Sequence, residues 1–104
     1  MAEVEHTADA RRFLISVDGR QVGLLDYQVR DDAFIALHTE IDPAYGGRGL
    51  GGELVERVLD HVRTTGLRLV PECSFVAHYV DQHPQYADLV PSPTDRPAGA
   101  EGES

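Results

Sequence analysis

The sequence contains no lysine and no tryptophan, and its only cysteine is Cys73. Without lysine there is no amine for a Schiff base and no phosphate-binding lysine of a P-loop. One cysteine allows neither an intramolecular disulfide nor a cysteine-rich zinc site. No apolar run approaches the roughly 20 residues of a membrane span, and the acidic N-terminus does not resemble a signal peptide. We therefore expect a cytoplasmic protein that does not enter a membrane.

Positive charge is also scarce, because nine arginines stand against eighteen Asp and Glu and give a net charge of −9. Such a surface repels nucleic acid and anionic membranes, so we expect neither as a partner. The excess of acid either favours cationic partners or simply maintains solubility. A chain of 104 residues has room for one domain, which we expect to be a monomer or a weak dimer.

The first half of the chain predicts three antiparallel strands. Apolar residues alternate over residues 12–17, and similar patterns follow at residues 21–29 and 33–41. Asp18-Gly19 is typical of a tight hairpin turn. Residues 1–9 are polar, and we expect them to form a frayed end.

The second half predicts a helix, a short strand and a second helix. An apolar stripe with a four-residue repeat runs from Leu50 to Val62, and Gly66 follows where a helix C-cap belongs. Residues 67–70 read as a buried strand ended by Pro71. Residues 74–82 read as a helix with Phe75, Val76, Tyr79 and Val80 pointing inward. The order βββ–α–β–α predicts an α/β fold with a mixed, mostly antiparallel sheet over residues 1–90, and residues 91–104 predict a disordered tail.

The segment that joins the two halves, Tyr-Gly-Gly-Arg-Gly-Leu-Gly-Gly at residues 45–52, holds five of the ten glycines. The first amides of a helix lack acceptors and lie at the positive end of its dipole, and glycines let a pyrophosphate approach them. An anion-binding loop is therefore predicted, with a ligand-free turn as the alternative. Gly47, Gly49 and Gly52 also match the dinucleotide pattern G-x-G-x-x-G, but the chain is too short for the βα units of that fold.

The loop resembles motif A of the GNAT acetyltransferases, in which a strand leads through Q/R-x-x-G-x-G/A into a helix that holds the CoA pyrophosphate. Gly49 and Gly51 occupy the two glycine positions, and Gly46 stands where the family usually has glutamine or arginine. Three further segments, HTEIDP at 38–43, PECSFV at 71–76 and HPQY at 83–86, resemble the short YjdJ-type GNAT-like subfamily in order and spacing. The resemblance implies a truncated GNAT-like fold with acetyl-CoA as cosubstrate. The cofactor-binding residues that it implies are Ile41, Gly46, Gly47, Arg48, Gly49, Gly51 and Gly52.

Acetyl transfer needs a base for the amine proton, an oxyanion donor and a proton for the departing thiolate. Strand alternation places Phe34, Ala36, His38 and Glu40 on one face, so that His38 and Glu40 are neighbours near the loop. Either can accept the amine proton, or the two form only a polar pair at the sheet rim. A bulge, which is usual in this strand of GNAT folds, would break the face assignment.

Two further candidates come from the resemblance. The subfamily has a cysteine at the position of Cys73, where it faces the acetyl group and either carries it transiently or lines the pocket. Tyr79 aligns roughly with the tyrosine that many GNAT enzymes use to protonate the thiolate, and its spacing equally suits a core tyrosine. His78 and His83 do not share a helix face with Cys73, so no metal site is expected.

The sequence thus predicts an acetyl-CoA-dependent N-acetyltransferase in which the amine attacks directly and Cys73 lines the pocket. The alternative is a CoA-binding module with little or no turnover, because the helices that shape the acceptor pocket of larger GNAT enzymes are missing. The acceptor is left open among small amines, peptide N-termini and protein lysines, and the acidic surface favours a cationic one.

Overall fold

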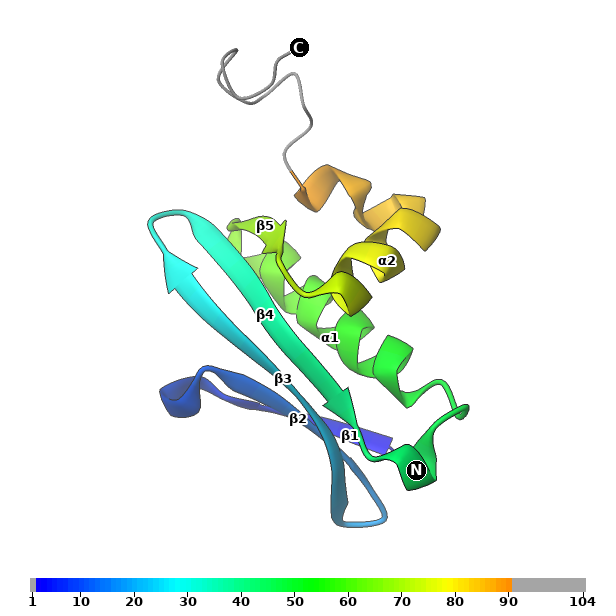
Figure 1. The fold of residues 1–104 in the computed structure, drawn as a ribbon. Coiled ribbons are helices and arrows are strands. Elements are labelled where there is room, and N and C mark those ends of the chain that lie inside the picture. Colours follow the sequence, from blue (N-terminus) through cyan, green and yellow to red (C-terminus); the bar gives the residue numbers. More distant parts are fainter. Residues whose placement is uncertain (1, 91–104) are drawn as a thin grey trace.

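A five-stranded sheet forms the frame of the molecule in a computed structural model that describes residues 2–90. The strands lie side by side in chain order, and only β5, which follows the crossover through α1, is parallel to its neighbour (Figure 1). The α/β fold with a mixed, mostly antiparallel sheet is confirmed, and the predicted tail lies outside the described residues. The elements are β1 (Ala2–Thr7), η1 (Ala8–Ala10), β2 (Arg12–Val17), β3 (Arg20–Arg30), β4 (Ala33–Ile41), η2 (Pro43–Tyr45), α1 (Leu50–Thr65), β5 (Arg68–Pro71), α2 (Ser74–Gln82) and η3 (Pro84–Leu89).

The first strand differs from the prediction that residues 1–9 form a frayed end. Residues 2–7 form β1, which pairs with β2 along its whole length. Val4 packs against the core, and the His6 ring stacks on Phe13 with 4.1 Å between centroids. The two glutamates of the strand are exposed, so its apolar alternation was too short to recognise. The observed order is therefore ββββαβα.

The hairpin between β2 and β3 turns at Asp18 and Gly19, as predicted. Their φ angles are 51° and 82°, which is the backbone of a primed hairpin turn. β2 and β4 have the predicted bounds, whereas β3 extends one residue further at each end than residues 21–29. The period-2 pattern therefore located these three strands correctly.

Helix α1 closes the core on one side of the sheet. Gly66 is its C-cap with φ 78°, as predicted. Burying one aliphatic side chain of this kind contributes roughly 1.5–3 kcal/mol, so the helix and its N-terminus are held firmly against the sheet. The buried stripe consists of Leu50, Leu54, Val55, Val58, Leu59 and Val62.

Strand β5 is short and leads directly into α2. It begins and ends one residue later than predicted, and Pro71 is its last residue instead of the residue that stops it. It pairs with residues 33–36 of β4 and with none of residues 37–41. The second half of β4 therefore has one edge without a strand partner. Helix α2 has the predicted bounds.

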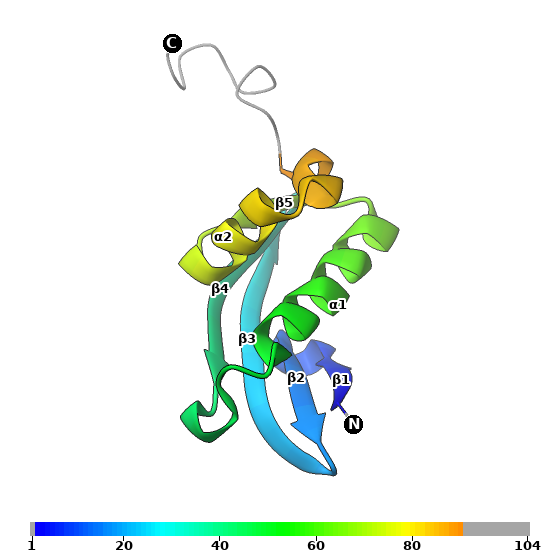
Figure 2. The same cartoon turned by 90° about the vertical axis from the view of Figure 1, so that its right-hand side faces the viewer.

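The two helices lie side by side on the same face of the sheet (Figures 1 and 2). The N-terminal turn of α1 contacts α2, because Gly51 and Gly52 lie against the rings of Phe75 and Tyr79. Neither helix covers the opposite face. No helix within residues 2–90 is long and apolar enough to cross a membrane.

Candidate functional site

The glycine segment connects β4 to α1 through the short helix η2. The Asp42 side chain caps η2 by accepting the amide of Ala44 at 2.9 Å. Gly47 and Gly49 follow with φ angles of 79° and 77°, and Gly49 is the N-cap of α1. No side chain caps this helix. The first amides of α1 therefore lack intrahelical acceptors, at the positive end of the helix dipole.

A cavity of about 260 Å³ opens beside these amides. A Cβ at Gly47 or Gly49 would meet no atom within 4 Å, so their backbone borders open space. Both also need positive φ, which other residues rarely adopt. The cavity is lined by Ile41, Tyr45, Gly46, Gly47, Gly49, Leu50, Gly51, Gly52 and Phe75.

Glycine is required inside α1, at residues 51 and 52, for a different reason. A Cβ at Gly51 would lie 2.7 Å from Cζ of Phe75, and one at Gly52 would lie 3.3 Å from Cε2 of Tyr79. These two glycines therefore let α2 approach α1 closely. The glycines of the loop thus serve both an open cavity and a helix contact.

Phe75 corrects the prediction that it points into the core with Val76. It is 42% exposed, whereas Val76 is fully buried. Its ring lines the cavity together with Ile41. Helical spacing did not distinguish burial in the core from contact with a neighbouring glycine.

Strand β4 contains a bulge that divides the predicted catalytic residues. Tyr27 pairs with Ala36 and Asp26 with His38, so Leu37 has no partner in the register. The prediction that His38 and Glu40 share a face with Phe34 and Ala36 is therefore wrong. Phe34 and Ala36 are buried on the helix side, while His38 and Glu40 lie on the opposite, exposed side.

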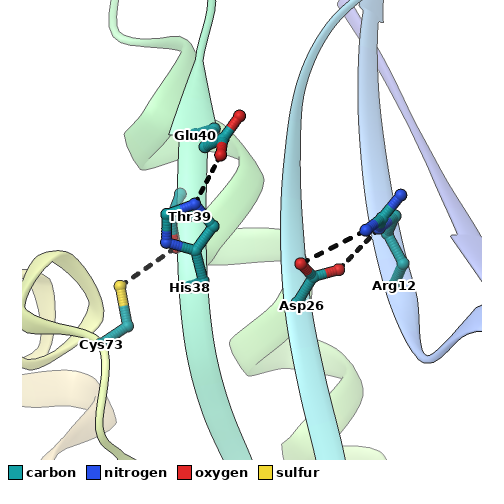
Figure 3. Close-up of polar contacts among 6 residues, drawn as sticks. All are labelled: Arg12, Asp26, His38, Thr39, Glu40 and Cys73. Carbon is teal, nitrogen blue, oxygen red and sulfur yellow. Dashed lines mark hydrogen bonds and ion pairs between the residues drawn. The ribbon is translucent and has the colours of Figure 1, made fainter.

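His38 and Glu40 are nonetheless neighbours, as the strand period predicts. Nε2 of His38 lies 2.7 Å from Oε2 of Glu40, and their side chains are 54% and 63% exposed. Beside them Arg12 donates to Asp26 at 2.6 Å, which raises the Arg12 pKa (Figure 3). The open face of the sheet therefore carries a polar group next to the bulge.

Cys73 lies on the other side of β4. Its amide donates to the carbonyl of Ala36 at 2.9 Å, and its thiol donates to Oγ1 of Thr39 at 3.4 Å (Figure 3). The side chain is buried. Thr39 and Ile41 are alternate residues of β4, so the thiol and the glycine-loop cavity meet the same side of the strand.

Tyr79 lies between α2 and α1. Its ring stacks on His83 with 3.9 Å between centroids, and it covers Gly52. Burial raises the pKa of its hydroxyl, and the carboxylates of Glu56 and Asp60 raise it further. The hydroxyl is therefore protonated at neutral pH.

Arg48 supplies positive charge at the loop. Its Cζ lies 4.9 Å from the centre of the Tyr45 ring, a cation–π contact that restrains the side chain. Within residues 2–90 no three His, Cys, Asp or Glu side chains gather into a group that could hold a metal ion. The candidate site offers a ligand the backbone amides of the loop and the guanidinium of Arg48.

Comparison with known proteins gives the family. A family profile described as GCN5-related N-acetyl-transferase matches residues 12–89. The chain belongs to this family. Protein NATD1 of Gallus gallus is 31% identical over 84 residues, which make up 79% of this chain and 76% of the relative. The expected GNAT membership is thus confirmed.

Solved structures share the GNAT-like fold. A GCN5-like protein of Staphylococcus aureus superposes with a TM-score of 0.67 at 24% identity, over 85% of this chain and 86% of that one. Rv2747 of Mycobacterium tuberculosis, solved in complex with CoA, gives 0.57 at 24% identity, over 69% of this chain and 49% of that one. At these identities the likeness concerns the fold alone.

Sequence reasoning missed three residues of the candidate site. Tyr45 and Phe75 line the cavity, and Thr39 is the partner of the Cys73 thiol. Tyr45 precedes the first glycine of the loop directly, which was a usable signal. The position of Thr39 depends on the bulge, for which no glycine or proline in β4 gives a sign.

Proposed function

We propose that this GNAT-family protein transfers the acetyl group of acetyl-CoA to an amine. The observation that carries the proposal is the cavity at the glycine loop, which lies beside the uncapped N-terminus of α1. Helix N-termini of this kind bind phosphate groups through backbone amides and the helix dipole. Family membership and the CoA bound by its fold relative Rv2747 support acetyl-CoA as the ligand.

The residues present fit a pyrophosphate. Open space at Gly47 and Gly49 lets phosphate oxygens reach the backbone, and the α1 amides of Leu50 and Gly51 are free to donate. Arg48 adds the charge that a phosphate favours. Gly46 and Gly52 line the same cavity, and Ile41 gives it an apolar end.

Acetyl-CoA supplies an acetyl group activated as a thioester. In direct transfer the amine nitrogen bonds to the acetyl carbon, the carbon–sulfur bond breaks, the nitrogen loses a proton to a base, and the sulfur gains one from an acid. The hydrogen-bonded pair of His38 and Glu40 is the base in this proposal. Tyr79 is the acid, since its raised pKa keeps its hydroxyl protonated.

Cys73 lines the site in this proposal and forms no bond to the acetyl group. Its thiol already donates to Thr39, and its backbone is tied to Ala36, so it shapes the edge of β4 that β5 leaves unpaired. Direct attack requires only a positioned amine, a base and an oxyanion donor.

A transfer assay tests the function. The protein is incubated with acetyl-CoA and a panel of small amines, peptide N-termini and lysine peptides, and thiol release is measured together with the mass of the product. We expect thiol release that depends on one amine class. Binding of acetyl-CoA with no thiol release for any class would favour a CoA-binding module.

The charge of the protein suggests which amines to test first. With a net charge of −9, and with Glu40 and Asp26 on the open face, the protein attracts cationic acceptors. We expect polyamines and basic peptides to show a lower KM than neutral amines. Raising the salt concentration should reduce this preference, because salt screens exposed charges.

A further inference from the structure

The face of the sheet that the helices leave uncovered carries two leucines at its middle (Figures 1 and 2). Phe13 and Ile15 of β2 are buried in the core, so Leu14 between them points to the opposite, open face. Leu24 of β3 pairs with Leu14, and residues directly opposite each other share a face. Neither leucine belongs to the core. The two side chains therefore form an apolar strip on the open face.

The leucine strip ends in a carboxylate on each side. Glu5 of β1 lies opposite Leu14, and Glu40 of β4 lies opposite Leu24. Neighbouring strands are about 4.8 Å apart, so the strands that carry the two carboxylates are about 14 Å apart. Glu5 is exposed and takes part in none of the ion pairs within residues 2–90, and Glu40 is bonded to His38. One row across four strands thus reads acid, leucine, leucine, acid.

The adjacent row on the same face is already neutralised. Arg12 lies opposite Asp26, and the two form an ion pair at 2.6 Å (Figure 3). The leucine row therefore keeps Glu5 and Glu40 as its negative ends. A second copy of this chain does not complement such a face, because it would bring like carboxylates together. The complementary ligand is apolar along its length and positive at both ends.

We propose that the open face binds an amine acceptor that carries a second positive charge at the far end of a long alkyl chain. The chain covers Leu14 and Leu24, and the far ammonium pairs with Glu5. The near amine lies beside Glu40 and His38, the pair that acts as base in the proposed function. This inference rests on that function and gives the class of its acceptor, a long diamine.

An NMR titration of the native protein measures this binding without acetyl transfer. One probe is 1,10-diaminodecane, and the other is 10-aminodecan-1-ol, which has the same chain with a hydroxyl in place of the far amine. Both should shift the backbone amide signals of Leu14 and Leu24. The Kd of the diamine should be about threefold lower, the effect of one exposed ion pair. The short 1,4-diaminobutane cannot reach both carboxylates and should bind more weakly than the long diamine.

Two glutamate variants test the position of the far ammonium. Glu5→Gln should remove the advantage of the diamine, so that the two Kd values become equal. Glu3→Gln is the matched control, because it changes the same charge on the same face of β1 but lies opposite Ser16. It should keep the threefold ratio. Equal Kd values for the two probes in the native protein, or equal effects of the two variants, would contradict the inference.

Other occupants of the face would appear in the same spectra. A peptide of seven lysines that shifts the Leu14 and Leu24 signals at a lower Kd than the diamine would assign the face to a protein partner and overturn the inference. Shifts of these signals with protein concentration alone would show a dimer and also overturn it. If the diamine binds as expected but acetyl-CoA releases no thiol in its presence, the binding site stands and the proposed transfer fails.

Discussion

The thiol of Cys73 donates a hydrogen bond to the hydroxyl of Thr39, and the bulge at Leu37 makes this contact possible. The extra residue turns Thr39 toward the helices and His38 toward the open face. One irregularity therefore places the thiol and the candidate base on opposite sides of β4. In the proposed function the cofactor lies on the helix side and the amine approaches from the open face.

Cys73→Ala should retain at least about a third of the activity, because direct transfer leaves the thiol chemically inert. The alanine side chain fills the space of the thiol less well, which should lower the free energy of unfolding by about 1 kcal/mol. Activity and denaturant unfolding are measured on the same sample. An acetyl adduct on native Cys73 that hydroxylamine removes, and that forms and decays at the turnover rate, would disprove the prediction.

Glu40→Gln should lower kcat by about a hundredfold, the usual contribution of a general base, and leave acetyl-CoA affinity unchanged. The matched control is Asp26→Asn, a carboxylate on the same open face that pairs with Arg12 instead of His38. It should reduce kcat by less than about threefold. Equal effects of the two variants would show that only the charge of the face matters.

Stability should depend on the protonation of His6. Partial desolvation of its ring, which stacks on Phe13, lowers the His6 pKa below 6.5, and the charge of His61 on α1 lowers it further. As pH falls, the unfolded chain therefore binds this proton before the folded chain does. The stabilisation that neutral His6 gives the folded state is complete above pH 6.5 and is lost as pH falls through the lowered pKa. The melting temperature should fall between pH 7 and pH 5.

His6→Gln provides the comparison for the pH dependence. Glutamine does not titrate and can keep a hydrogen bond to the hydroxyl of Tyr27, which lies 2.6 Å from Nε2 of His6. The fall in melting temperature over this range should be smaller in the variant. An identical pH profile would mean that the unfolded and folded states bind the His6 proton equally.

Gly51→Ala tests the contact between the two helices. Alanine in a helix stabilises by about 0.5–1 kcal/mol relative to glycine, but here its Cβ would lie 2.7 Å from the Phe75 ring. This gain in the free energy of unfolding should appear in full only when Gly51→Ala is combined with Phe75→Ala. A double-mutant cycle by chemical unfolding measures this coupling. Additive changes would show that the ring moves away freely.

Most of the fold could be predicted because its elements follow simple periods. Alternation gave β2 and β4, and the four-residue stripe gave α1 with its cap at Gly66. β1 was missed because only Ala2 and Val4 among its aliphatic residues pack against the core. The His6 ring, which stacks on Phe13, supplies the rest of its packing. Short strands that depend on a partner leave little pattern in the sequence.

The glycine loop of the candidate site could be predicted from the sequence, but the directions of the side chains around it could not. The glycines indicated where an anion can reach a helix N-terminus, since that need is local. The side on which His38 and Thr39 point depends on the bulge at Leu37, which arises from pairing with β3. The exposure of Phe75 likewise depends on a glycine in another helix.

Binding of acetyl-CoA at the glycine loop can be tested by calorimetric titration of three proteins. We predict saturable binding to the native chain and no detectable binding to Gly49→Glu, whose carboxylate would occupy the open space beside the α1 amides. Gly19→Glu is the control, because Gly19 has φ 82° and nothing within 4 Å of a Cβ, but lies in the β2–β3 turn. The Gly19→Glu protein should carry the same backbone strain and bind acetyl-CoA with native affinity. Unchanged affinity in Gly49→Glu, or no binding to the native chain, would contradict the binding of acetyl-CoA at this loop.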